Sequence, residues 1–71
     1  MQTVTQTLER ANTIYHTSVQ KEALAEQAQA LRALLAQGWL NERNRENAEA
    51  LLWRVQAKEL ALAYFTEGYN E

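Results

Sequence analysis

The hydrophobic residues in the centre of this chain recur with helical spacing along two long segments. In the first segment, steps of four, three and four residues join Leu24, Ala28, Leu31 and Leu35. This pattern predicts an amphipathic helix over about residues 18–37. The second segment, about residues 42–67, carries the main stripe Ala48, Leu51, Leu52, Val55, Leu62, Phe65 and Tyr69. The two stripes predict two long helices, each of which buries one side.

The residues between these segments predict a tight corner. Gly38 stands where a helix commonly ends in a left-handed residue, and Trp39 would then contact Leu34 in the last turn. Asn41 offers a side-chain oxygen to the free N–H groups of the next helix. Because so short a loop leaves the two helices antiparallel, we expect a helical hairpin. Gly68 predicts a similar helix end near the C-terminus.

The first 16 residues predict a shorter helix with a separate role. Leu8, Ala11 and Tyr15 have near-helical spacing, and Thr3 with Gln6 forms a capping-box pattern. On one continuous helix this face would lie roughly opposite the stripe that begins at Leu24, on a side occupied by glutamates. We therefore expect a break near residues 16–18, with Ser18 capping the second helix. The fold class is all-α: residues 1–71 form one domain, with an N-terminal segment 1–16 and a hairpin 18–67.

The second long helix also carries an apolar face opposite its main stripe. Trp53, Ala57, Leu60 and Tyr64 follow one another at i, i+4, i+7 and i+11. A helix that is apolar on opposing sides is normally buried on both, as in a bundle of more than two helices. The sequence thus predicts that dimerisation or a partner protein completes the bundle. The competing interpretation is that the N-terminal helix folds back over the Trp53 face.

The composition favours self-association or a protein partner as the source of stability. A chain of 71 residues has a marginal core, and the absence of cysteine excludes disulfides. Ala, Leu, Glu, Gln and Arg dominate, as in long-helix and coiled-coil proteins. The net charge of −2 provides no bulk basic field for nucleic acid. Neither a membrane-spanning run nor a signal-peptide pattern is present, so the expected location is the cytoplasm.

The polar residues do not indicate an enzyme. His16 is the only histidine and is interpreted as a linker residue, because a metal site needs several convergent ligands. Glu42, Glu46 and Glu49 are interpreted as a solvated first turn that suits the helix dipole. We expect no catalytic residue, no cofactor, no metal and no small-molecule substrate. Trp39 and Phe65 are expected to fill the core. The predicted partner-binding residues are Trp53, Ala57, Leu60, Tyr64, Tyr15 and Leu8.

These features favour a non-enzymatic protein–protein interaction module, such as an adaptor, a co-chaperone or an inhibitor. In size and outline the chain resembles the small co-chaperones of type III secretion needle subunits, in which a short helix precedes a helical hairpin. Small phage-encoded inhibitors of host proteins are similar in outline. The alternative is a homodimeric four-helix bundle that binds RNA, similar in plan to small plasmid-copy-control proteins. Arg43, Arg54 and Lys58 would then be the possible nucleic-acid contacts.

Overall fold

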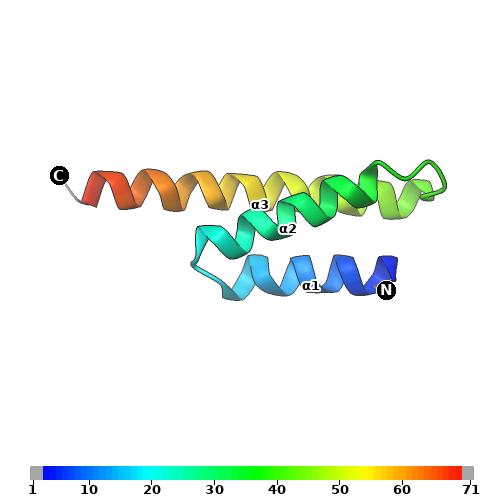
Figure 1. The fold of residues 1–71 in the computed structure, drawn as a ribbon, viewed down its shortest axis with the longest axis horizontal. Helices are drawn as coiled ribbons and strands as arrows, with labels where there is room; N and C mark the ends of the chain where they lie inside the picture. The colour runs from blue at the N-terminus through cyan, green and yellow to red at the C-terminus, as the bar shows by residue number, and fades with distance from the viewer. Residues whose placement is uncertain (1–2, 70–71) are drawn as a thin grey trace.

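Residues 3–69 fold as three helices in an up-down-up arrangement. The computed structural model describes the backbone of residues 3–69 and the side chains of residues 3–64. Helix α1 spans Val4–Thr17, α2 spans Lys21–Leu35 and α3 spans Glu42–Tyr69. In Figure 1 each helix runs antiparallel to the next, and the C-terminal part of α3 extends beyond both shorter helices. The predicted all-helical fold and antiparallel hairpin are confirmed for the described residues.

Helix α1 begins at the predicted capping box. The backbone N–H of Gln6 donates to Thr3 Oγ1 at 3.1 Å, and the backbone N–H of Thr3 donates to Gln6 Oε1 at 3.0 Å. These bonds satisfy two polar groups that the first turn would otherwise leave unpaired. The helix spans residues 4–17 and so is displaced slightly from the predicted 1–16.

The predicted break is present, but Ser18 does not cap the second helix. Ser18 ends α1, and its Oγ accepts the backbone N–H of Gln20 at 3.1 Å. Helix α2 then begins at Lys21, with Gln20 at the N-cap position and no side-chain cap hydrogen bond. The expected start at residue 18 is therefore wrong, because the Ser18 hydroxyl stabilises the link between the helices instead of the first turn of α2.

The corner between α2 and α3 differs from the expected glycine ending. Helix α2 ends at Leu35 rather than at residue 37, and Gly38 does not have a positive φ. The guanidinium group of Arg45 donates to the carbonyl oxygens of Leu35 and Gln37, both at 3.0 Å. An arginine from the next helix thus binds carbonyl oxygens at the end of α2 and in the corner, and the backbone N–H of Gln37 donates to the carbonyl oxygen of Leu34 at 3.1 Å. The prediction of a left-handed ending at Gly38 is wrong, because these bonds satisfy the last carbonyls without it.

Asn41 caps α3 as predicted, because its Oδ1 accepts the backbone N–H of Asn44 at 2.8 Å. Replacing Asn41 with alanine should lower the free energy of unfolding by about 1 kcal/mol, the usual cost of losing an N-cap. Urea unfolding followed by circular dichroism measures this change. Asn41→Ser keeps a capping oxygen and should stay close to the native value. Equal losses in both variants would contradict the capping role.

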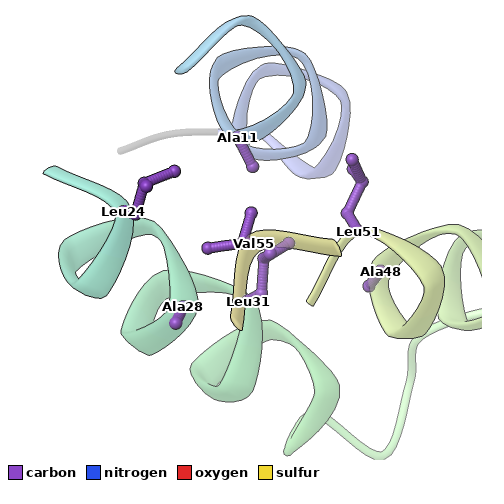
Figure 2. Close-up of a cluster of buried hydrophobic side chains, with 7 residues drawn as sticks. All are labelled: Ala11, Leu24, Ala28, Leu31, Ala48, Leu51 and Val55. Atoms are coloured by element: carbon purple, nitrogen blue, oxygen red, sulfur yellow. The ribbon is translucent and has the colours of Figure 1, made fainter. Parts of the chain in front are cut away.

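The core is formed where one side of each helix meets the other two. Figure 2 shows Leu24 and Leu31 of α2 and Val55 of α3 converging beneath Ala11 of α1. The cluster consists of Ala11, Leu24, Ala28, Leu31, Ala48, Leu51 and Val55, all of which are buried. Three of the seven are alanines, whose small side chains let the helices approach closely. Only Leu24, Leu31 and Val55 are both large and fully buried among the described residues, so the core is small.

Helix α3 is longer than its predicted range and much longer than α2. It has 28 residues, against 15 in α2, and it continues to Tyr69 instead of ending at residue 67. The expected glycine ending at Gly68 is wrong, since the helical backbone passes through this residue. The predicted contacts of Phe65 and Tyr69 lie outside the described side chains.

Candidate functional site

The most distinctive surface of the molecule is an apolar face on α3, formed by Trp53, Ala57, Leu60 and Tyr64. We call it the α3 outer face. The exposed fractions of Trp53, Leu60 and Tyr64 are 73%, 71% and 80%, and Ala57 is exposed as well. At 100° per residue the four side chains lie within an arc of about 60° over three turns of the helix. They form one continuous strip.

This face is exposed because the other two helices pack on the opposite side of α3. Ala48, Leu51 and Val55 are the α3 residues that face the core, and they are all buried. Helix α1 contacts α3 along the side that carries Leu51 and Arg54, where residues from both helices line a shallow groove that reaches Ala50. The N-terminal helix therefore borders this face but leaves Trp53, Leu60 and Tyr64 exposed, so the competing interpretation is wrong.

Alanines adjoin the α3 outer face on one side, and charged residues border it: Arg54 lines a groove with Ala50, and Glu59 lines another with Leu60. Ala50 and Ala61 are exposed and extend the strip on one side. Glu46, one turn before Ala50, is exposed in line with Tyr64. The strip therefore consists of three large apolar or aromatic side chains separated by alanines, with a carboxylate at its N-terminal end.

The other two predicted partner-binding residues occupy a different environment. Leu8 and Tyr15 are half-buried and pack against the core from α1. Lys58 of α3 donates to the carbonyl oxygen of Tyr15, and its Nζ lies 5.5 Å from the centre of the Tyr15 ring. Tyr15 thereby joins the C-terminal end of α1 to α3. Partner contact by Leu8 and Tyr15 stays a prediction, and the structure does not bring them together with Trp53.

The three basic residues proposed for nucleic-acid contact are not equivalent. Arg43 and Arg54 are exposed, whereas Lys58 is half-buried and engaged with Tyr15. A continuous basic strip would need all three side chains free to reach phosphates. The internal contact of Lys58 leaves two separated arginines, so this arrangement favours RNA binding less than the sequence did.

Trp39 is exposed rather than buried, contrary to its predicted core role. Its exposed fraction is 67%, and its Nε1 donates to Gln37 Oε1 at 3.2 Å. It lies at the rim of a shallow groove between α1 and α2 that Val4 and Leu34 also line. Leu40, which the periodicity did not single out, is buried beside it in the corner. Its position immediately before the Asn41 cap is the signal that could have identified it.

Among the described residues, His16 does not belong to a cluster of possible metal ligands. His16 is exposed and makes an edge contact with the Tyr15 ring, with the ring centres 4.9 Å apart. Within the described part of the chain, acidic residues and histidine do not gather in groups of three that could hold a metal ion. None of the described helices combines the length and apolar character that crossing a membrane requires. The predicted absence of enzymatic activity stays a prediction.

Comparison of the chain with protein-family models, curated proteins and solved structures gave no significant match.

Proposed function

We propose that this protein is a non-enzymatic interaction module that binds a protein partner through the α3 outer face. The observation that carries this proposal is the exposure of Trp53, Leu60 and Tyr64 along one strip of α3. Trp and Tyr are the residues that contribute most to binding energy at protein interfaces. Adaptors, co-chaperones and inhibitors all use such a surface, because these roles require binding to a protein but no catalysed reaction.

The α3 outer face is not needed to form the fold. Trp53 and Tyr64 lie opposite the core, so polar residues would serve the helix equally well at these positions. Exposing them costs solvation free energy that burial in a complex would recover. The three large side chains expose about 400–500 Å² in total, estimated from typical side-chain areas. Patches of this size on small proteins commonly mark an interaction site.

The spacing of the strip fits a known mode of recognition. Anchors at i, i+4, i+7 and i+11 let one helix face enter an apolar groove or pack against another helix. Helices α1 and α2 pack against the opposite side of α3, so α3 is already folded before it binds. Binding then loses less conformational entropy than it would for a segment that folds on its partner.

A pull-down from a lysate of the source cells tests the proposal. The wild-type chain should retain one or more proteins, a second copy included, and the double variant Trp53→Ala/Tyr64→Ala should lose them. Two truncated anchors should weaken binding by at least about a hundredfold. Trp39→Ala is the matched control, because it removes a tryptophan of similar exposure from the corner.

Circular dichroism should show equal helicity in wild-type and double-variant protein, since both substitutions place alanine at exposed helical positions. Equal retention of partners by the folded double variant would overturn the proposal. Loss of partners with Trp39→Ala alone would move the binding surface to the corner.

A further inference from the structure

The α3 outer face has a pattern of large and small residues that suits a second copy of itself. Ala57 lies near the middle of the strip, and Ala50 and Tyr64 lie seven residues to either side of it. Trp53 precedes Ala57 by four residues and Leu60 follows it by three. Large side chains thus alternate with alanines about a small central position.

We propose that two copies of this chain pack antiparallel through their α3 outer faces, with a two-fold axis near Ala57. This inference rests on the proposed function and names its partner. In this arrangement each Tyr64 lies over Ala50 of the second copy, because both are about 10 Å from the axis along the helix. Each Trp53 lies beside Leu60 of the second copy, on the same side of the axis. The two copies of Ala57 meet at the centre and allow the helices to approach closely.

The antiparallel direction follows from where the bulky residues lie. In a parallel, in-register pair, Trp53 would face Trp53 and Tyr64 would face Tyr64, while the alanines would face one another across gaps. The antiparallel pair instead places the Tyr64 ring over Ala50, a small side chain, and sets each Trp53 beside a leucine rather than beside a second tryptophan. Such large-on-small complementarity is what gives interfaces the packing density of protein interiors.

The area available suits a weak, reversible dimer. The three large side chains expose about 400–500 Å² per copy, and the alanines around them add to this, so two copies bury about 1,000 Å² or more. This value lies at the lower limit for biological interfaces. The dimer is therefore expected to be reversible, with dissociation visible on dilution.

The core of the single chain is small, so additional burial in a dimer would stabilise the fold. Only three large side chains are fully buried in the described part of the molecule, and the sequence contains no cysteine for a disulfide. Chains of this length commonly depend on disulfides, metals or oligomerisation for stability. A second copy accompanies the chain wherever it is made, whereas a different protein need not.

Light scattering across a hundredfold range of protein concentration tests the dimer. We expect a mass near twice the 8.2 kDa of the chain at high concentration and a fall towards 8.2 kDa on dilution. Trp53→Ala/Tyr64→Ala should remain monomeric over the whole range, and Trp39→Ala should behave as wild type. Ala57→Arg provides a second variant. Residue 57 is exposed in the single chain, so the substitution leaves the core unchanged, but in the dimer it places two positive charges next to each other at the axis. This variant should also be monomeric.

Single cysteines test the direction, since the native chain contains none. Ala57→Cys should form an intermolecular disulfide on mild oxidation, because the two copies of residue 57 meet at the axis. Ala50→Cys should not, because its two copies lie about 20 Å apart in the antiparallel pair, well beyond disulfide reach. Efficient cross-linking of Ala50→Cys would overturn the antiparallel arrangement, as would a dimer that fails to cross-link through Ala57→Cys.

The outcomes separate this inference from the proposed function. A wild-type chain that is monomeric at every concentration overturns the dimer. The monomer can still retain a different protein in the pull-down and release it when Trp53 and Tyr64 are both replaced with alanine. In that case the proposed interaction module stands, and its partner is a different protein. A dimer that persists in both Trp53→Ala/Tyr64→Ala and Ala57→Arg overturns the use of this face for self-association.

Discussion

Leu31→Ala is expected to leave much of the protein unfolded at room temperature. Leu31 is fully buried in the centre of the cluster, where α2 meets α3. Truncating a buried leucine to alanine costs about 2–5 kcal/mol through lost burial and the cavity left behind. A single core in a chain this short rarely supplies more than about 3–5 kcal/mol in all. Helicity measured by circular dichroism during thermal and urea unfolding will report the loss.

A matched pair of valines provides the control for this prediction. Val55→Ala removes a fully buried side chain and should cost about 2 kcal/mol, whereas Val19→Ala removes an exposed one and should change stability by less than about 0.5 kcal/mol. All variants must be compared at one protein concentration, because self-association would couple stability to concentration. Equal effects at Val55 and Val19 would contradict the assignment of the core.

Arg45→Ala is expected to have the second largest effect, a loss of about 1.5–3 kcal/mol. The guanidinium group makes two charge-assisted hydrogen bonds to the end of α2, and the one to Leu35 is partly buried. Its positive charge also lies at the C-terminal end of that helix, where a cation is favourable. Urea unfolding of Arg45→Ala should therefore show a clearly lower midpoint than that of the wild-type protein.

Two further variants isolate the corner interaction. Arg43→Ala removes an exposed arginine from the same turn of α3 and should leave the midpoint almost unchanged. Arg45→Lys keeps the positive charge but loses the planar guanidinium group that donates two hydrogen bonds. The stability of this variant should therefore fall between those of the wild type and Arg45→Ala. A value for Arg45→Lys as low as that for Arg45→Ala would assign the effect to geometry alone. A native midpoint for Arg45→Ala would contradict the bridging role.

The regular parts of this fold are readable from the sequence because they depend on periodic burial. The stripe through Leu24 and Leu31 and the stripe through Val55 indicate which sides of α2 and α3 meet, and the structure confirms both. The change of phase near residue 17 likewise indicates where one helix must end and another begin. The exposed face with Trp53 follows from the same periodicity, since a second apolar strip lies opposite the first.

The corner and the contacts of α1 could not be read in this way. The hydrogen bonds of Arg45 join α3 to the end of α2 at Leu35 and to the corner at Gln37. The sequence shows only a charged residue in the first turn of a helix and does not indicate which carbonyl oxygens it will bind. Lys58 and Tyr15 are 43 positions apart, so their contact depends on how α1 docks. Hydrophobicity alone also misplaced Trp39, because the corner opens it to solvent.

The overhang of α3 makes the molecule long for its mass. The principal-axis extents are 47 × 17 × 15 Å and the radius of gyration is 13.0 Å, the value of a compact domain of about 100 residues. An elongated particle experiences more friction than a sphere of equal mass. The monomer will therefore elute early from a gel-filtration column and diffuse slowly, and globular standards will overstate its mass. Pairing two copies side by side through α3 thickens the particle while adding little length, so its frictional ratio falls as its mass doubles.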